Sequence, residues 1–419
     1  MVYKKFFFIL LFTLLANATG NAQQRTVDEV QKSIGDFSAS IKTYQNALVK
    51  IKPALQHDAT KNLAETWWIA GKAGYGLYSK FRIAKSMGNS IDDKQMGQAL
   101  IAGYEYCIKA LELDSVKVLN RDGSPKINKK TGQAKVKTKY SKEIQNRILK
   151  YLVDYSTIGA ELYKAEDWAG AFKAWNIYHE VATSPMAQER HVSDPDSIIG
   201  LMSYYQGMAA MKMNQLSEVH RLLKVARQYG YKKKTVYDND LFALTALGDT
   251  VMAVTIAQEA FRLYGKEDIR YLRIMINDCI NKHNYRDAEV MLDQAMLNDS
   301  LNAEYLNLKG NIVELQSSVL EARPYYQQAV ELDSTLAQAQ FDMGRCYYLE
   351  ALQYAQSHSK KSQKALTKAI APVLRRAVEH LEKSFELNPQ NADAKNILRD
   401  IYYKLGDAKK LDKLDHLMQ

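Results

Sequence analysis

Arginine and asparagine side chains recur at helical spacing in the last part of this 419-residue chain. Arg270, Arg273 and Asn277 are three and four residues apart, so an α-helix places them on one face. Guanidinium and amide groups on a shared surface can bind the carbonyl and carboxylate oxygens of a peptide. We therefore predict a polar peptide-binding surface, composed of Arg270, Arg273, Asn277, Asn307, Asn311, Arg345 and Tyr348.

A second group of candidate residues, mostly aromatic, lies in the first half of the chain. It comprises Trp68, Lys72, Tyr75, Tyr163 and Tyr204. Tyr and Trp side chains are frequent anchors in binding surfaces because they offer a large rigid area with a polar tip, and they also stack on sugar faces. Long helical stacks also need bulky residues between their helices. Two interpretations are therefore open, a second binding patch and core packing.

The most unusual local composition is a basic insert. Residues 117–142 contain nine cations and one acid, Asp122, giving a charge of +8 in a chain of net charge +10. Turn signals at residues 122–123 and 131–132 predict a short hairpin in which residues 126–128 pair with residues 135–137. Such a hairpin favours an anionic surface, either lipid headgroups or acidic glycan, and the alternative is a solvated loop. Its central cations are Lys126, Lys129, Lys130, Lys135 and Lys137.

Signatures of catalysis and of metal binding are absent from the sequence. The eight histidines are scattered, without a His-Glu-x-x-His pattern or a pair at metal-ligand spacing. Gly71, Gly74 and Gly76 superficially suggest a phosphate-binding loop, but they follow no predicted strand and fall within a predicted helix. We therefore predict a non-enzymatic protein with no catalytic residue, no metal site and no cofactor.

Five triplets have the form Asp-Ser/Thr followed by an aliphatic residue or Thr. This pattern resembles an O-glycosylation signal of envelope proteins in one Gram-negative group. The structural interpretation is that Asp and Ser end one helix and cap the next. The hydroxyl groups that glycosylation would modify belong to Ser115, Ser197, Thr250, Ser300 and Ser334.

A repeat of 34 residues identifies the elements that must position these side chains. Ala288 is followed by Ala322, Ala295 by Ala329, and Gly310 by Gly344. One small residue per unit is needed where neighbouring helices cross closely, so this period indicates stacked helix–turn–helix units. In this respect the chain resembles the tetratricopeptide repeat family.

The resemblance implies an all-α helical-repeat solenoid of about seven to eight helix pairs, with ligands bound on the inner face of the first helix of each pair. The candidate residues above occupy those inner positions. Some family members clamp a terminal carboxylate with basic and Asn residues in three successive repeats. Arg273 and Asn277 match the first pair, but Leu308, Gln338 and Asp342 replace the later ones. We therefore expect a broader groove for polar or acidic peptide backbone.

The predicted organisation places the clearest repeats late in the chain. It consists of a signal peptide (1–22), a capping helix (23–63), a first repeat with an insertion (64–115), the basic insert (116–140), degenerate repeats (141–265), clear repeats (266–336) and C-terminal repeats with an insertion (337–419). An apolar stripe of period 3.5 predicts one continuous helix over residues 26–57.

The first 22 residues have the pattern of an export signal. Lys4 and Lys5 precede a largely apolar run, and Gly20 and Ala22 provide small residues at a cleavage site. We expect a periplasmic or otherwise exported chain, without a transmembrane segment after cleavage, in a Gram-negative cell. The repeat pattern places all three cysteines at buried helical positions, which favours free thiols over a disulfide.

These observations predict an exported scaffold that binds a protein or peptide partner in its groove, in assembly or maintenance of the cell envelope. The alternative is a glycan-binding envelope protein that uses the aromatic residues of the first half. Export argues against a nucleic-acid partner.

Overall fold

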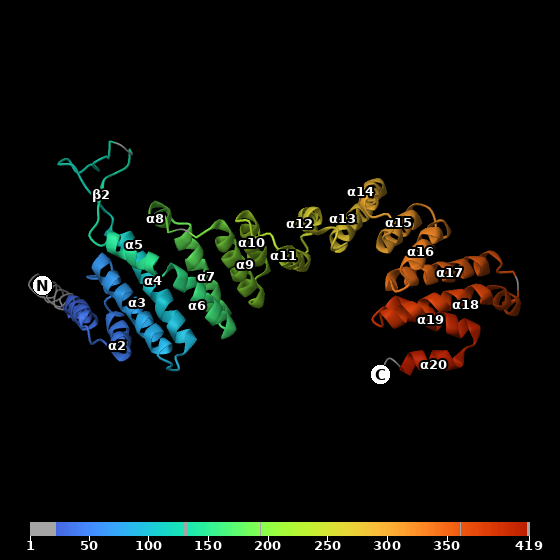
Figure 1. Cartoon of the computed structure of the whole chain (residues 1–419), viewed down its shortest axis with the longest axis horizontal. Coiled ribbons are helices and arrows are strands. Elements are labelled where there is room, and N and C mark those ends of the chain that lie inside the picture. Colours follow the sequence, from blue (N-terminus) through green and yellow to red (C-terminus); the bar gives the residue numbers. More distant parts are fainter. Residues whose placement is uncertain (1–21, 130–131, 193, 361, 417–419) are drawn as a thin grey trace, which may run out of the picture. The chain divides into compact units, whose positions relative to one another are not determined.

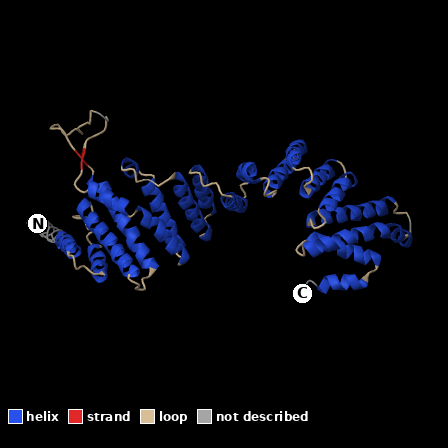
Figure 2. Ribbon diagram, in the orientation of Figure 1, coloured by secondary structure: helices blue, strands red, loops and turns tan. Residues whose placement is uncertain are grey.

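The computed structural model describes residues 22–129, 132–192, 194–360 and 362–416. The chain divides into two compact units, Met1–Leu247 and Gly248–Gln419. Both units are built almost entirely of α-helices (Figures 1 and 2). The signal-peptide prediction concerns residues that, apart from Ala22, lie outside the described ranges.

The first unit begins with a helix over residues 22–35. Its later elements are α2 (Ile41–Ile51), α3 (Ala64–Ser86), α4 (Asp93–Asp114), β1 (Val116–Lys117), β2 (Val136–Lys137), α5 (Ser141–Lys150), α6 (Leu152–Lys164), α7 (Trp168–Ala182), α8 (Pro185–Glu189), α9 (Asp196–Lys212), α10 (Leu216–Gln228) and α11 (Lys234–Leu247). Within it α3 packs on α4, α6 on α7, and α9 on α10.

The second unit contains helices only, as far as the structure describes it. They are α12 (Thr250–Tyr264), α13 (Arg270–Asn281), α14 (Tyr285–Asn298), α15 (Ala303–Gln316), α16 (Val319–Leu332), α17 (Ala337–Ser357), α18 (Gln363–Leu387), α19 (Ala392–Leu405) and α20 (Ala408–His416). Consecutive helices pack in pairs from α13 with α14 to α19 with α20. The prediction of an all-α fold of stacked helix pairs is therefore confirmed.

The small residues of the 34-residue period lie where paired helices cross. A Cβ atom on Gly310 of α15 would fall 2.5 Å from the ring of Tyr326 in α16. A Cβ atom on Gly344 of α17 would fall 2.6 Å from Leu381 in α18. Because real Cβ atoms do not approach neighbours this closely, only glycine allows these crossings.

The N-terminal region corrects the prediction of one helix over residues 26–57. The helix of residues 22–35 and α2 are separated by a turn in which Phe37 is fully exposed. Ser40 starts α2 as its N-cap, with its side chain accepting a hydrogen bond from the Thr43 backbone. The apolar stripe continues past the break because both helices pack toward α3, in a cluster that includes Val30 and Ile51.

The two long insertions lengthen helices. In the first repeat α3 and α4 have 23 and 22 residues, and late in the chain α17 and α18 have 21 and 25, whereas α15 and α16 have 14 each. The glycines at positions 71, 74 and 76 all lie inside α3, as predicted. Cys107, Cys279 and Cys346 are free and buried, which confirms the prediction of unpaired thiols.

The basic insert leaves the helices at Asp114 and returns at Ser141. The Asp114 side chain is almost fully buried and accepts hydrogen bonds from the backbone N–H groups of Lys139, Tyr140 and Ser141, at 3.0, 2.8 and 2.7 Å. The Tyr140 hydroxyl donates to Glu65 of α3 at 2.8 Å. One carboxylate therefore fastens both ends of the insert to the helices beside it.

Candidate functional site

The first turns of three successive inner helices line a hollow in the second unit. α13 contributes Arg270 and Arg273, α15 contributes Glu304, and α17 contributes Gln338. The hollow has a volume of about 430 Å³, and three acids line it beside the two arginines. The rest of its lining is Glu267, Asp268, Ile269, Leu336, Ala337 and Asn388. Helix N-termini carry partial positive charge and N–H groups without an intrahelical acceptor, so their convergence favours carboxylate and carbonyl oxygens.

The two arginines of this hollow are accessible to a ligand. The Arg270 side chain is 63% exposed and forms a bidentate pair with Asp268. The Arg273 side chain is 42% exposed, and its Nη2 donates to Glu304 at 3.1 Å. The Arg273 Nε atom is buried and has no hydrogen-bond partner among the described residues. Asp268 accepts a hydrogen bond from the Arg270 backbone N–H of α13, and Asn302 accepts from Glu304 and Tyr305 of α15. Leu336, the N-cap residue of α17, provides no side-chain cap.

Further along the inner helices, the predicted polar residues bind each other. Asn307 of α15 is buried, and its Nδ2 donates to Asp342 of α17 at 3.0 Å. Gln338 also donates to Asp342, at 3.1 Å. Burial raises the pKa of Asp342, against the opposing effect of these hydrogen bonds. The prediction that Asn307 faces a groove is wrong, because its position at the α15–α17 contact is closed.

A second part of this polar network is a bidentate ion pair. Arg345 of α17 donates to both carboxylate oxygens of Glu314 in α15, at 2.6 Å each. The Tyr326 hydroxyl from α16 shares its one proton between Glu314 Oε2 at 2.7 Å and Asn311 Oδ1 at 2.9 Å. Burial opposes ionisation of Glu314, but hydrogen bonds from Arg345 and Tyr326 outweigh it and lower its pKa.

The predicted surface therefore divides into an open part and a part occupied by internal contacts. Arg270, Arg273 and the exposed Asn277 form the open part. Asn307, Asn311 and Arg345 join the internal network, and Tyr348 donates to Asp400 of α19 at 2.7 Å. Glu304, Gln338 and Asn388 were missed as lining residues. Their positions could have indicated this role, because Glu304 and Gln338 lie in the first turn of an inner helix and Asn388 follows the end of an outer helix.

The aromatic candidates in the first unit lie mostly in its core. Trp68 and Tyr75 are 1% and 0% exposed, and the Tyr75 hydroxyl forms a 2.6 Å hydrogen bond with that of Tyr155. The prediction of an exposed patch is wrong for both, because α5 and α6 cover this side of α3 with residues such as Tyr151 and Tyr155. The Lys72 ammonium lies 5.2 Å from the Trp68 ring centre, and burial lowers the Lys72 pKa.

Tyr163 and Tyr204 are half-buried and pack against other rings. Tyr163 makes an edge contact with Trp168 at a centroid distance of 4.7 Å. Tyr204 lies 5.4 Å from Tyr231. Because neighbouring aromatic residues cover part of both rings, this region offers a sugar fewer open stacking surfaces than the sequence suggested.

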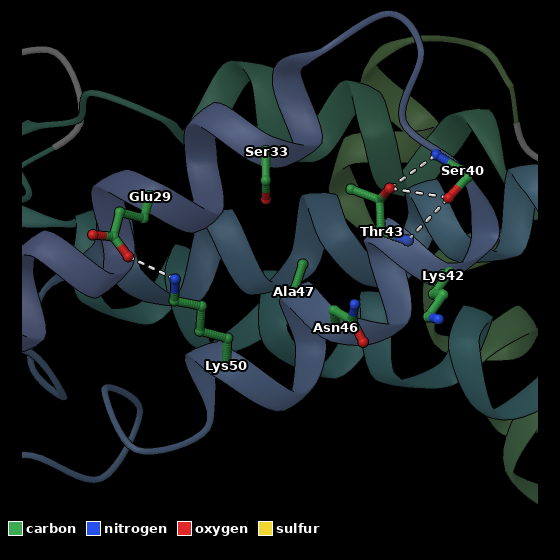
Figure 3. A pocket seen from close by; sticks show the side chains of 8 residues that line it. All are labelled: Glu29, Ser33, Ser40, Lys42, Thr43, Asn46, Ala47 and Lys50. Atoms are coloured by element: carbon green, nitrogen blue, oxygen red, sulfur yellow. Dashed lines mark hydrogen bonds and ion pairs between the residues drawn. The ribbon is translucent and has the colours of Figure 1, made fainter.

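A separate hollow of about 380 Å³ lies between the helix of residues 22–35 and α2 (Figure 3). Two of its three charged side chains pair, with Lys50 Nζ 2.6 Å from Glu29, and Lys42 is the third. Ser40 and Thr43 on its other side form the hydrogen bonds that cap α2 (Figure 3). The hollow contains no residue singled out by the sequence, and its side chains have structural roles.

The five candidate glycosylation residues are all exposed and lie at or beside helix ends. They are Ser115, Ser197, Thr250, Ser300 and Ser334. The preceding aspartates have structural roles in several cases. Asp249 caps α12 and Asp333 accepts a hydrogen bond from Thr335. Glycosylation at these positions stays a prediction.

The basic insert contains paired strands, but the predicted register of residues 126–128 with residues 135–137 is wrong, because Val136 and Lys137 pair with Lys117 and Val116 of β1 instead. Ile127 pairs with Ala134, and the Lys135 backbone N–H donates to the Lys126 carbonyl at 2.7 Å. Strands β1 and β2 add an antiparallel pairing at its base. Lys126, Lys129, Lys135 and Lys137 are exposed, and Lys130 lies outside the described residues.

Two further properties hold for the residues that the structure describes. They contain no cluster of three or more His, Cys, Asp or Glu side chains arranged to hold a metal ion. Among the described helices, none combines the length and the hydrophobicity that crossing a bilayer requires.

Comparison with known proteins links the second unit to a repeat family. Residues 280–337, which include α14, α15 and α16, match the family model described as tetratricopeptide repeat. No curated protein sequence matches the chain.

Several solved structures of tetratricopeptide repeat proteins are similar to this chain. The C-terminal part of one from Cytophaga hutchinsonii is 14% identical, covering 61% of this chain and 91% of that one, with a TM-score of 0.35. One from Bacteroides fragilis is 13% identical, covering 60% and 98%, with a TM-score of 0.29. YrrB, described as having an unusual peptide-binding site, is 14% identical, covering 61% and 95%, with a TM-score of 0.28.

Proposed function

We propose that this chain, a protein with tetratricopeptide repeats, is a scaffold that binds an extended segment of a partner protein. The proposal rests on one observation above all, the hollow of about 430 Å³ at the first turns of α13, α15 and α17. Successive helices of the repeat bring their N-termini to this one place, and two arginines lie beside them.

The chemistry of the hollow favours a peptide with carboxylate groups. Arg270 and Arg273 can each form charge-assisted hydrogen bonds with a carboxylate, and helix N–H groups can bind main-chain carbonyls. Asp268 and Glu304 pair with these arginines in the free protein. An acidic side chain of the partner would replace such a contact, and Asn277, one turn further along α13, extends the surface that it can reach.

The binding role accounts for the chain better than catalysis does. Arg345 pairs with Glu314, and Asn307 and Gln338 donate to Asp342, so these polar groups hold the inner helices in place. The alternative of glycan binding has less support, because Trp68 and Tyr75 are buried.

The proposed setting is outside the cytoplasm, in assembly or maintenance of the cell envelope. Its support is the charged and apolar pattern of residues 1–22. Mass spectrometry of the chain purified from an expressing Gram-negative cell tests it. A mature N-terminus at Gln23 in the periplasmic fraction supports export, and a full-length chain in the cytoplasm contradicts it.

Selection of peptides from a displayed random library tests the binding role. Wild-type protein is compared with an Arg270→Ala/Arg273→Ala double variant. The matched control is Lys282→Ala/Arg286→Ala, which removes two cations from the exposed surface at α13 and α14 outside the hollow. Exposed ion pairs contribute about 0–1 kcal/mol each, so both variants are expected to stay folded.

We expect wild type and control to enrich the same Asp- and Glu-rich peptides, and the hollow variant to enrich none of them. Enrichment of the same peptides by all three proteins would place binding elsewhere. Failure of every protein to enrich any peptide would contradict a general peptide-binding role.

A further inference from the structure

The basic insert is held in one place beside the helices. Asp114 fixes its return strand through three backbone N–H groups, and Tyr140 is bonded to Glu65 of α3. The strands lie outside the helix pairs of the first unit (Figure 2). These contacts therefore fix the base of the hairpin beside the helices, whereas a flexible loop would have no fixed position.

The pairing of its strands places aliphatic side chains together. Residues paired across strands lie on one face, and so do residues two apart along a strand. The observed pairs are Lys117 with Val136, Leu119 with Pro125, and Ile127 with Ala134. These three pairs are linked by two-residue steps along each strand, so one face carries Leu119, Pro125, Ile127, Ala134 and Val136, together with Lys117 opposite Val136.

The opposite face carries three lysines together with Val116, which is 63% exposed. Lys137 pairs with Val116, and Lys135 lies two residues before it on the same strand. Lys126 lies between Pro125 and Ile127, so it points away from the aliphatic face. Within the part of the chain that the structure describes, none of these three lysines has an acid within ion-pair distance.

Exposure of the aliphatic face is the observation that calls for a partner. Leu119 is 56% exposed, and Ile127 and Val136 are 52% exposed each. A soluble polyanion such as nucleic acid or acidic glycan would use the cations alone and leave these side chains in water. An anionic bilayer uses both, because aliphatic groups enter the boundary between headgroups and acyl chains while lysines lie among the phosphates.

We propose that residues 116–129 and 132–139 form a membrane-surface anchor that binds anionic lipid bilayers. Leu119, Ile127 and Val136 insert into the interface, and Lys126, Lys135 and Lys137 supply the attraction to the headgroups. Binding is peripheral and reversible, and it is independent of the peptide-binding hollow in the second unit.

Co-sedimentation of the full mature chain with vesicles tests this anchor. One set of vesicles is phosphatidylcholine alone, and in the other phosphatidylglycerol replaces one third of it. The variants are Lys126→Ser/Lys135→Ser/Lys137→Ser for the basic face and Leu119→Thr/Ile127→Thr/Val136→Thr for the aliphatic face. The matched control is Lys360→Ser/Lys364→Ser/Lys368→Ser, which removes three exposed cations of the late insertion.

The expected result is binding to the anionic vesicles only. Each lysine near an anionic surface strengthens binding about five-fold, so loss of three weakens it about a hundred-fold. The aliphatic variant is expected to weaken binding about ten-fold or more, because inserted side chains contribute buried apolar area. The control is expected to bind like wild type.

Three results would overturn the proposal. The first is no binding of wild type to either set of vesicles. The second is an aliphatic variant that binds the anionic vesicles like wild type, because electrostatics alone would then suffice and an acidic polymer would be the better partner. The third is an equal loss in the control, which would assign binding to net charge rather than to the hairpin.

Discussion

Replacing Asp114 by alanine removes the acceptor that holds the return strand of the hairpin. Its carboxylate receives three backbone hydrogen bonds of 2.7–3.0 Å and one from the Ser141 hydroxyl at 2.7 Å. A hydrogen bond to a charged group contributes about 1.5–3 kcal/mol, and four bonds to one carboxylate are not additive. We expect a loss of about 3 kcal/mol in local stability, which is about a hundred-fold in the equilibrium for local opening.

Hydrogen–deuterium exchange of the amides of Lys139, Tyr140 and Ser141 measures this opening directly. The Asp114→Ala variant is expected to exchange there about a hundred-fold faster, because these N–H groups lose their acceptor. Asp114→Asn, which keeps one oxygen acceptor without the charge, is the matched control. Its exchange rate is expected to lie between those of wild type and Asp114→Ala. Amides in α9 and α10 should exchange as in wild type.

The same contact has a defined pH dependence. Burial opposes ionisation of Asp114, but the bonds from Ser141 and from the backbone outweigh it and lower its pKa. A depressed carboxyl pKa stabilises the folded state above the unfolded value of about 3.9, and this stability is lost as the pH falls through the lower folded value. If Asp114→Ala leaves the exchange protection of these three amides unchanged, Asp114 does not hold the return strand.

Three further predictions concern the helix pairs. Gly310→Ala is expected to lower the melting temperature by several degrees, because its Cβ would meet Tyr326, whereas Gly35→Ala, with nothing within 4 Å, is expected to cause no such loss in the same calorimetric measurement. Tyr326→Phe is expected to cost about 1–2 kcal/mol in urea unfolding, because Glu314 loses a buried donor, and a cost near zero would contradict the network. Cys346 is expected to resist alkylation in the native protein at pH 8, because burial raises its pKa to about 11, and to react fully in denaturant.

The local pattern of the sequence was enough to predict the helix pairs. Gly310 and Gly344 show the repeat because each must be small for a purely local reason, the approach of the next helix in the chain. The burial of the three cysteines was predicted from the same repeat pattern. The 3.5-residue stripe of residues 26–57 was misleading, because both helices on either side of Phe37 pack their apolar residues toward α3.

The candidate site was harder to predict because it depends on contacts between repeats. Arg345 and its partner Glu314 are 31 residues apart, and so are Arg273 and Glu304. A list of inner-face positions identifies Arg345 and Arg273 alike, but it does not reveal that Glu314 accepts hydrogen bonds from both terminal guanidinium nitrogens of Arg345. Trp68 and Tyr75 occupy inner positions too, yet α5 and α6 cover them. Sequence position identified the face, and tertiary packing determined which of its residues are open.

Calorimetric titration of a library-selected acidic peptide against the protein is the most direct test of peptide binding at the hollow. Arg270→Ala/Arg273→Ala is expected to weaken binding by at least about ten-fold, because each charge-assisted contact contributes about 1.5–3 kcal/mol and neighbouring contacts are not additive. Glu304→Gln is expected to strengthen binding, because this acid pairs with Arg273 in the free protein. Equal affinity for wild type, the double variant and the Lys282→Ala/Arg286→Ala control would contradict the assignment of the hollow as the peptide-binding site.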